Sequence, residues 1–253
     1  MSDIASLFGA GANAYPSSRP EYPDALFTWL ASNSPNNERA LDIGCGNGQA
    51  SRPLRQHFQQ VLACDGSPEQ LLAAKDLRDL DCFAANAEAQ PLPDASLDLI
   101  IVAQALHWFA TPAFFAEVRR LLRPNGLFCA WCYSLLRING ELDALLEDFY
   151  GNTLGPYWPL GRASVDAGYR DIQPPFQRLQ VPPFAIQVQW TLPQLLGYLG
   201  TWSAVQRLQQ ASGCNPLLAL QPQLTEAWGE PDQERFISWP LHFLAGLPNT
   251  SHQ

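Results

Sequence analysis

The chain has 253 residues, of which 47% are hydrophobic and 15% are charged, so it can bury a large core. Its formal net charge is −9, and its few arginines are scattered, which argues against a nucleic-acid partner because binding a polyphosphate needs clustered cations. There is no run of 18 apolar residues and no secretory signal in the opening MSDIASLFGAGANAYPSS, so we expect neither a membrane span nor export.

The cysteines, at positions 45, 64, 82, 129, 132 and 214, lie mostly within strand-like apolar runs. This predicts small buried side chains in a reduced cytoplasm rather than a disulfide framework. Cys129 and Cys132 form a C-x-x-C, for which a redox or metal pair is the alternative. However, LFCAWCYS resembles one continuous strand, and no second C-x-x-C or histidine pair completes a ligand set. We therefore predict no metal.

The first 135 residues alternate between helix-like and strand-like segments, which is typical of a parallel sheet covered by helices. The predicted helices are 23–31, 50–58, 68–76 and 112–122, and the predicted strands are 40–43, 61–64, 82–85, 97–103 and 127–133. The run LDLIIVA at 97–103 is the most apolar, so it should lie at the sheet centre, buried on both faces. The RPNG of 123–126 is a turn signal before the fifth strand.

After Ser134 prolines and aromatic residues accumulate, with amphipathic helices near 141–152, 191–210 and 216–228 and a last strand in FISWPLHFLAG. We expect an insertion packed over one edge of the sheet, because this last strand has no sheet of its own to join. The prediction is a single domain, 1–253. Its parts are an N-terminal lid segment at 1–37, a core at 38–134, an insertion at 135–235, and a final strand and tail at 236–253.

The run LDIGCGNG at 41–48 places an acid and three glycines at the end of the first predicted strand. Such a turn holds a ligand against bare main chain and the N–H groups of the following helix. A dinucleotide fingerprint is not met, since Gln49 stands where the third small residue belongs, and no Gly-Lys-Ser/Thr ending marks a P-loop. With Asp65 ending the next apolar run, the pattern suits a nucleoside with a cationic amino-acid tail.

In an open parallel sheet, ligands bind outside the carboxyl ends of the strands. Asp65 can accept two hydrogen bonds from the vicinal hydroxyls of a ribose; a helix N-cap before Pro68 is the alternative. Asn86 and the backbone amide of Ala87 can read a purine edge, or Asn86 is a plain turn residue. The strand-end residues are Asp42, Gly44, Cys45, Gly46, Gly48, Asp65, Gly66, Ser67, Asn86, Ala87, Glu88, Gln104, Ala105, His107 and Trp108.

Taken in order, LDIGCGNG, CDGSPEQLLAA, AANAEAQPLPDASLDLI and LLRPNGLF resemble the motifs of class I S-adenosylmethionine-dependent methyltransferases. The resemblance implies a Rossmann-like α/β fold: a seven-stranded, mostly parallel sheet with helices on both faces and an antiparallel last strand. It also implies S-adenosylmethionine as cofactor and S-adenosylhomocysteine as product. Many relatives carry an aspartate where this chain has Asn86, but the side-chain amide of Asn86 can still form a hydrogen bond with an adenine. The predicted cofactor-binding residues are the strand-end residues from Asp42 to Ala105, together with Tyr15 and Arg19.

Three further features resemble the branch that includes trans-aconitate methyltransferase-like enzymes: Y-x-x-x-R-P-x-Y-P at 15–23, QALHWF at 104–109 and YLGTWSAVQRL at 198–208. The branch implies a small-molecule acceptor, and we expect it to carry a carboxylate or a hydroxyl. Neither nucleic acid nor membrane is expected as a partner, and the chain is predicted to be a monomer or a homodimer.

Methyl transfer is an in-line displacement, so the main requirement is to place the acceptor atom opposite the leaving sulfur. A hydroxyl acceptor also needs a general base, for which His107 is the candidate; otherwise His107 packs against Trp108 as a pocket wall. Tyr22, His107 and Trp108 are the predicted substrate contacts. Arg19 could clamp a carboxylate, and Tyr15 and Tyr22 form a lid or simply seal the sheet.

The aromatic residues of the later part of the chain line either an acceptor cavity or the core. They are Trp158, Phe176, Phe184, Trp190, Trp202 and Trp239. Two alternative functions remain open from the sequence: a nucleotide-dependent oxidoreductase, and a cofactor-binding pseudoenzyme or regulatory module. A nucleic-acid methyltransferase is the least favoured, because the composition lacks a basic surface.

Overall fold

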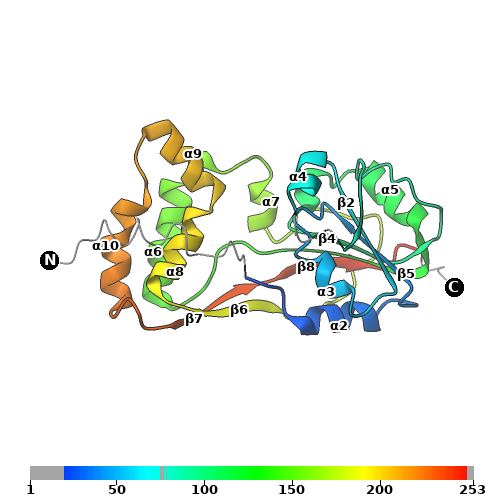
Figure 1. Cartoon of the computed structure of the whole chain (residues 1–253), viewed down its shortest axis with the longest axis horizontal. Coiled ribbons are helices and arrows are strands. Elements are labelled where there is room, and N and C mark those ends of the chain that lie inside the picture. The colour runs from blue at the N-terminus through cyan, green and yellow to red at the C-terminus, as the bar shows by residue number, and fades with distance from the viewer. Residues whose placement is uncertain (1–19, 75–76, 78, 250–253) are drawn as a thin grey trace. The chain divides into compact units, whose positions relative to one another are not determined.

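The computed structural model describes residues 20–74, 77 and 79–249, and these divide into two compact units (Figure 1). The sheet unit comprises residues 22–134, 163–185 and the chain from 240 onward; the described residues of the helical unit are 20–21, 135–162 and 186–239. The predicted insertion, 135–235, differs from this division. Residues 163–185 cluster with the sheet, whereas 236–239 cluster with the helices.

The central sheet has the mostly parallel, Rossmann-like arrangement that the sequence predicts. Its strands are β1 (Arg39–Ile43), β2 (Gln60–Asp65), β3 (Asp81–Ala84), β4 (Leu97–Ala103), β5 (Leu122–Cys132) and β8 (His242–Gly246). Their order is β3-β2-β1-β4-β5-β8, with β8 antiparallel to β5 and the other neighbours parallel. The described sheet therefore has six strands where seven were expected.

The run FISWPLHFLAG forms two strands, so its prediction as one strand is wrong. Its first half is β7 (Arg235–Pro240), which pairs with β6 (Ala185–Trp190) in a separate two-stranded sheet, and its second half is β8. Pro240 ends β7, because proline has no N–H to continue a ladder. The next N–H, that of Leu241, donates to the carbonyl of Phe184 at 2.9 Å. The insertion thus does have a small sheet of its own to join.

Four helices accompany the parallel strands of the sheet unit. They are α2 (Asp24–Ser32), α3 (Ser51–Leu54), α4 (Pro68–Ala73) and α5 (Pro112–Leu121). Helix α5 lies on one face of the sheet, and α2 and α3 lie on the opposite face (Figure 1). Helix α3 is shorter than the predicted 50–58. The chain after Leu54 continues in tighter turns, in which the N–H of Arg55 bonds to Arg52 and that of Gln56 to Pro53.

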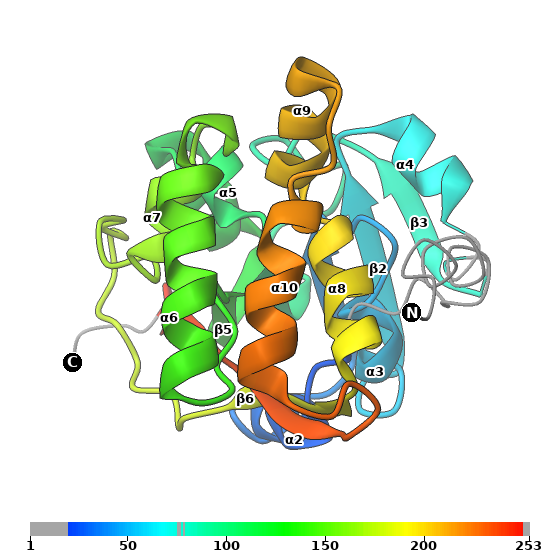
Figure 2. The same cartoon turned by 90° about the vertical axis from the view of Figure 1, so that its left-hand side faces the viewer.

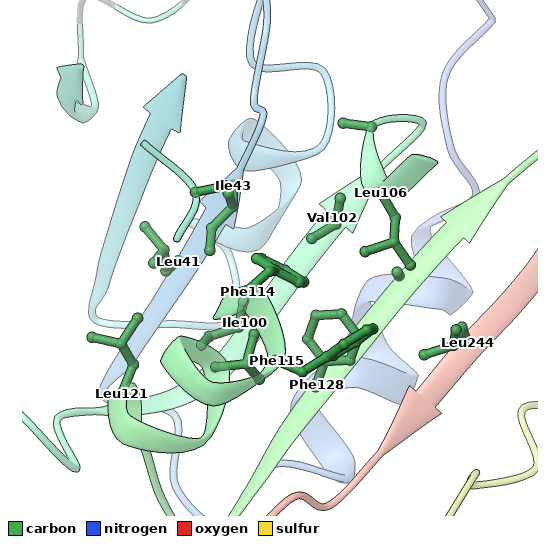
Figure 3. Packing of buried hydrophobic residues seen from close by; sticks show 14 of the residues in the cluster. Leu41, Ile43, Ile100, Val102, Leu106, Phe114, Phe115, Leu121, Phe128 and Leu244 are labelled. Atoms are coloured by element: carbon green, nitrogen blue, oxygen red, sulfur yellow. The ribbon is translucent and has the colours of Figure 1, made fainter. Parts of the chain in front are cut away.

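Strand β4 lies at the centre of the sheet, between β1 and β5, and its residues from Leu97 to Val102 are fully buried, as predicted. The main apolar cluster packs Phe114 and Phe115 of α5 onto Phe128 of β5 and Ile100 of β4 (Figure 3). The RPNG turn forms an irregularity within β5, since Leu122 pairs with Leu97 but the next pair is Leu127 with Leu99.

The helical unit contains the amphipathic segments of the later sequence. They are α6 (Gly140–Asp148), η3 (Phe149–Thr153), η4 (Gly155–Tyr157), α8 (Leu192–Gly200), α9 (Ser203–Ser212) and α10 (Leu217–Trp228). Helix α10 packs between α6 and α8 (Figure 2). The predicted helix 191–210 is two helices, because Trp202 adopts an extended conformation between α8 and α9. Among the described residues, no helix combines the length and apolarity needed to cross a bilayer.

Candidate active site

The glycine-rich segment turns sharply after β1, as the sequence predicts. Gly44, Gly46 and Gly48 have φ values of 74°, 53° and 81°, a region that side chains with a Cβ rarely occupy. The N–H groups of Gly44 and Cys45 both donate to the carbonyl of Cys64, at 2.8 and 3.0 Å. The turn is therefore tied to the end of the neighbouring strand β2.

The three glycines serve different purposes in this turn. A Cβ on Gly44 would lie 2.7 Å from the Cβ of Ala105, and one on Gly48 would lie 2.1 Å from Cδ2 of Leu77. Both positions allow close packing within the protein. A Cβ on Gly46 would meet only the side-chain oxygen of Gln70 at 3.7 Å, an ordinary contact. Gly46 is thus the position whose bare backbone has room for a ligand.

Asp65, at the end of β2, accepts hydrogen bonds from two turns. The N–H of Gly46 donates to Oδ2 and the N–H of Ser67 donates to Oδ1, both at 2.9 Å. A carboxylate has about four acceptor sites, so these bonds leave capacity for a ligand. The helix cap is Ser67, whose hydroxyl accepts from the N–H of Gln70, so Asp65 is not the N-cap of α4. Gly66 between them is exposed.

Asp42 is a fully buried acid at the end of β1. The hydroxyl of Ser51 donates to its Oδ2 at 2.5 Å, and Oδ1 has no hydrogen-bond partner among the described residues. Burial raises the pKa of Asp42 to about 7, and the nearby Asp65 adds to this, while the Ser51 bond opposes it. Burial also raises the pKa of the Cys45 thiol. Asp42 is therefore a buried acid with one carboxyl oxygen left without a hydrogen-bond partner among the described residues.

The segment after β3 places Asn86, Ala87 and Glu88 in a tight turn. Asn86 accepts from the N–H of Glu88 through its side-chain oxygen at 3.1 Å, and from Nε2 of Gln90 through its carbonyl at 2.8 Å. Asn86 therefore does act as a turn residue, and the residue is exposed. Ala87 is buried, and Glu88 accepts from the hydroxyl of Thr111, the N-cap of α5.

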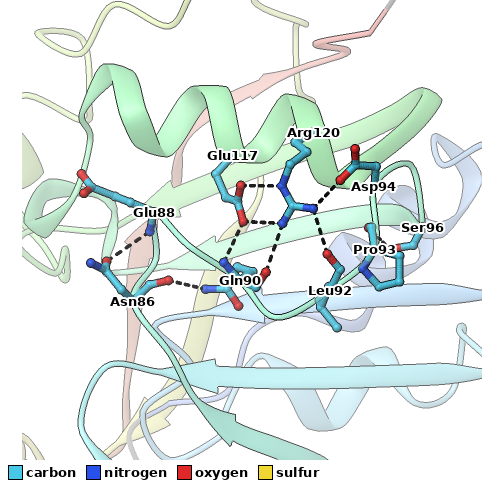
Figure 4. Close-up of polar contacts among 9 residues, drawn as sticks. All are labelled: Asn86, Glu88, Gln90, Leu92, Pro93, Asp94, Ser96, Glu117 and Arg120. Atoms are coloured by element: carbon cyan, nitrogen blue, oxygen red, sulfur yellow. Dashed lines mark hydrogen bonds and ion pairs between the residues drawn. The ribbon is translucent and has the colours of Figure 1, made fainter.

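Two charged residues of α5, Glu117 and Arg120, hold the loop that follows this turn (Figure 4). Glu117 accepts from the N–H of Gln90 at 2.7 Å, and Arg120 donates to the carbonyls of Gln90 and Leu92 at 3.0 and 2.8 Å. The two side chains also form an ion pair at 2.7 Å, and Arg120 bonds to Asp94 at 2.6 Å. No local sequence pattern predicts this support, because Arg120 and its partners in the loop are 26 to 30 residues apart.

Gln104 and Ala105 follow β4 and face the glycine turn and β5. Gln104 has a φ of 55°, and its side-chain amide pairs with the backbone of Tyr133: Nε2 donates to the carbonyl at 2.9 Å, and Oε1 accepts from the N–H at 3.3 Å. The Gln104 side chain is therefore engaged with the protein. Ala105 is the neighbour that requires glycine at position 44.

His107 lies on a single helical turn, η2 (Leu106–Trp108), directly after β4. Its ring centroid is 4.8 Å from that of Trp108, which is 60% exposed. On its other side, Nδ1 of His107 lies 3.3 Å from the hydroxyl oxygen of Tyr169. Sequence reasoning missed Tyr169, which is 62 residues further along the chain and belongs to no motif.

Tyr22, a predicted substrate contact, is 7% exposed and packs edge-on against Trp131, with ring centroids 5.4 Å apart. For Tyr22 itself, this burial favours the alternative of sealing the sheet. Tyr15 and Arg19 lie outside the described residues.

The predicted cavity aromatics fall into three groups. Phe176 and Phe184 belong to the sheet unit, Trp239 is fully buried, and Trp158, Trp190 and Trp202 are half-buried in the helical unit.

The C-x-x-C is not a paired site. Cys129 and Cys132 are both buried in β5, three positions apart, so their side chains point to opposite faces of the sheet. Cys45 and Cys64 are also buried, whereas Cys82 and Cys214 are exposed. Within the part of the chain that the structure describes, no group of three histidine, cysteine or acidic side chains could hold a metal ion.

These features define a class of protein: an open α/β sheet whose candidate ligand-binding residues lie at the carboxyl ends of β1, β2, β3 and β4. Residues 41–130 match the family described as a methyltransferase domain. A Dictyostelium discoideum protein named as a methyltransferase is 33% identical over 244 residues, 94% of this chain and 93% of that protein. A methyltransferase of Schizosaccharomyces pombe is 34% identical over 81% of this chain and 82% of its own length.

Among solved structures, one assigned to a type II methyltransferase from Anaeromyxobacter dehalogenans is 41% identical. It superposes with a TM-score of 0.86 over 93% of this chain and all of that one. The chain belongs to the class I S-adenosylmethionine-dependent methyltransferases. None of these three names includes a methyl acceptor, and the trans-aconitate branch stays a prediction.

Proposed function

We propose that this protein transfers the methyl group of S-adenosylmethionine to an oxygen of a small organic molecule. The observation that carries the cofactor assignment is the contact between Gly46 and Asp65. This contact places the backbone of Gly46, which has room for a ligand, beside the carboxylate of Asp65, which can accept further hydrogen bonds. The two residues lie at the carboxyl ends of the adjacent strands β1 and β2. Family membership gives the reaction type, and the acceptor is our proposal.

The residues of the site fit the parts of the cofactor. Asp65 would accept from the ribose hydroxyls, and Asn86 with the N–H of Ala87 would pair with the adenine edge. The buried Oδ1 of Asp42, which has no hydrogen-bond partner among the described residues, suits the ammonium of the amino-acid portion. When bound, the cofactor supplies a methyl carbon made electrophilic by its sulfonium.

The protein itself must then position the acceptor and, for a hydroxyl acceptor, remove its proton. A carboxylate acceptor is already ionised near neutral pH and needs no base. A hydroxyl acceptor needs one, and His107 follows β4, in the part of the sheet edge where Gln104 and Ala105 also lie. The scattered basic residues of an acidic chain support a small-molecule acceptor over a nucleic acid. We also propose that the protein is located in the reducing cytoplasm and that it is a monomer or a homodimer.

Calorimetry with S-adenosylmethionine and S-adenosylhomocysteine tests the cofactor, with NAD as the comparison ligand. We expect both adenosyl compounds to bind and NAD not to bind; the reverse result would indicate an oxidoreductase. Incubation of the protein with methyl-labelled S-adenosylmethionine and a small-molecule cell extract, followed by mass spectrometry, tests the reaction. Cofactor binding without any labelled product across extracts would instead support a pseudoenzyme or regulatory module.

A further inference from the structure

The side chain of Gln70, on α4, lies beside the bare backbone of Gly46. Its Oε1 would be 3.7 Å from a Cβ at that position. The N–H of the same glycine donates to Oδ2 of Asp65 at 2.9 Å. Gly46 therefore has the Asp65 carboxylate on its N–H and the Gln70 amide near its Cα, so a ligand that rests on this glycine lies within reach of both side chains.

The local sequence favours a different role for Gln70. Ser67-Pro68-Glu69-Gln70 has the S-x-x-Q pattern of a capping box, in which the side chain at N3 accepts from the N–H of the N-cap residue. Half of this box is present, because the N–H of Gln70 donates to Oγ of Ser67 at 3.3 Å. In the other half Asp65 replaces Gln70, since the N–H of Ser67 donates to Oδ1 of Asp65 at 2.9 Å.

Asp65 thus releases the side chain of Gln70 from the helix cap. Gln70 is exposed, and its side-chain amide forms no hydrogen bond with the residues that the structure describes. The hydroxyl of Ser67 donates to Oε2 of Glu69 at 2.9 Å, so this hydroxyl is engaged both as a donor and as an acceptor without the Gln70 side chain. The amide keeps two N–H donors and an acceptor for a ligand.

Helix α8 of the same chain shows the complete capping box. It begins after Thr191, and Oε1 of Gln194 accepts from the N–H of Thr191 at 2.8 Å. Gln70 and Gln194 both occupy position N3 of their helices. They differ in what the side chain does, because Gln194 completes its capping box and Gln70 does not. The two glutamines therefore form a matched pair for mutation.

We propose that Gln70 binds the cofactor by donating a hydrogen bond to an oxygen of its ribose hydroxyls. The inference rests on the proposed function, in which these hydroxyls donate to Asp65. A hydroxyl that donates its hydrogen keeps its oxygen lone pairs, and the carboxylate of Asp65 cannot donate to them. A half-turn of the Gln70 amide brings Nε2 to the position of Oε1, and Nε2 can donate. Gln70 thus adds selectivity for ribose over deoxyribose.

Calorimetry with S-adenosylhomocysteine on the full chain tests this contact. Gln70→Met keeps the length of the side chain and removes its amide. We expect the affinity to fall about fivefold to tenfold, the usual loss for one neutral hydrogen bond. An unchanged affinity would overturn the proposal. Tighter binding in Gln70→Ala would also overturn it, because the side chain would then only obstruct the site.

Deoxy analogues of S-adenosylhomocysteine identify the bonded atom. With one of the two compounds, the 2′-deoxy or the 3′-deoxy analogue, the wild type and Gln70→Met should bind within about twofold of each other, because the hydroxyl that Gln70 meets is absent. With the other analogue, Gln70→Met should weaken binding as it does with S-adenosylhomocysteine. If the full loss persists with both analogues, Gln70 meets no ribose hydroxyl and the proposal is wrong.

Gln194→Met is the matched control. It removes a complete capping-box bond, so the midpoint of urea unfolding should fall, while the affinity for S-adenosylhomocysteine stays within about twofold of the wild type. Gln70→Met should show the reverse pattern, with a midpoint close to that of the wild type and a reduced affinity. If Gln70→Met lowered the midpoint as much as Gln194→Met does, Gln70 would be a structural residue.

Activity separates this inference from the proposed function. In the labelled-extract assay, the concentration of S-adenosylmethionine that gives half-maximal labelling should rise in Gln70→Met by the same factor as the dissociation constant. The maximal rate should not change, because the contact with the ribose is equal in the ground state and the transition state. If the wild type does not bind S-adenosylhomocysteine, the proposed function itself fails. If it binds and Gln70→Met binds equally well, only the inference about Gln70 fails.

Discussion

The N–H of Gly46 donates to Oδ2 of Asp65 at 2.9 Å, joining the loops that follow the neighbouring strands β1 and β2. The carboxylate is held by this bond and by the N–H of Ser67, so its direction is set before any ligand arrives. A preorganised acceptor loses little freedom on binding. One ligand can therefore meet the bare glycine and the acid together.

Replacing Asp65 with alanine should weaken cofactor binding by roughly 1.5 to 3 kcal/mol, the usual loss for charged hydrogen bonds. Calorimetry with S-adenosylhomocysteine measures this directly. Asp79→Ala removes an exposed acid elsewhere in the sheet unit and is the control for net charge. Unchanged affinity in Asp65→Ala would refute the ribose role of this carboxylate.

Gly46→Ala and Gly48→Ala should separate binding from folding. At position 46 the new Cβ has room, so we expect a stability loss of about 1 to 2 kcal/mol from the positive φ alone, with cofactor affinity strongly reduced. At position 48 the Cβ would lie 2.1 Å from Leu77. Overpacking adds about 1 to 3 kcal/mol there. Denaturant unfolding and calorimetry on both variants check this, and equal stability losses would contradict it.

The free energy of unfolding should fall as pH rises from about 4 to 7, because of Asp42. Its pKa in the folded chain is raised to about 7 from 3.8, so the folded state favours the protonated carboxyl. The stabilisation of the folded state by this carboxyl is complete below pH 3.8, and it is lost as the pH rises through about 7. A difference of one in pKa is equivalent to about 1.4 kcal/mol. Asp42→Asn cannot ionise and should flatten this part of the curve, measured by urea unfolding.

Cofactor binding should show the opposite pH trend from the same residue. An ammonium group prefers the ionised carboxylate, so affinity should rise between about pH 5.5 and 7 as the proton leaves Asp42. The α-amino group of the cofactor stays protonated over this range. Calorimetry at several pH values would measure the slope. If Asp42→Asn retains the wild-type slope, Asp42 does not meet the ammonium.

The support from α5 should control the adenine-reading turn. Arg120→Met breaks the bonds to Gln90, Leu92, Asp94 and Glu117, and we expect a loss of about 1 to 3 kcal/mol in stability for the partners left unpaired. The affinity for S-adenosylhomocysteine should fall in addition. Arg119→Met, an exposed neighbour on the same helix, is the control. Equal affinity in the two variants would mean that the loop keeps its conformation without Arg120.

Much of the sheet unit could be predicted from the sequence. The apolar run 97–103 has the same bounds as β4, and the glycines of 44–48 do adopt positive φ, because these signals are local. The prediction of secondary structure failed where one local sequence pattern is compatible with either one element or two. The run 236–246 has the composition of one strand, but Pro240 divides it between two sheets. Residues 191–210 have one helical pattern, but Trp202 is extended.

The sequence by itself determined the family motifs, the parallel core and the residues at the strand ends, since each depends on short-range spacing and residue type. Only the tertiary structure decided what those residues contact. It brought Tyr169 to His107, Arg120 to the loop after Asn86, and Ala105 to Gly44. It also left one oxygen of the buried Asp42 without a partner among the described residues. Such pairings join segments far apart in the chain, and they depend on how helices and loops pack on the sheet, which no local pattern encodes.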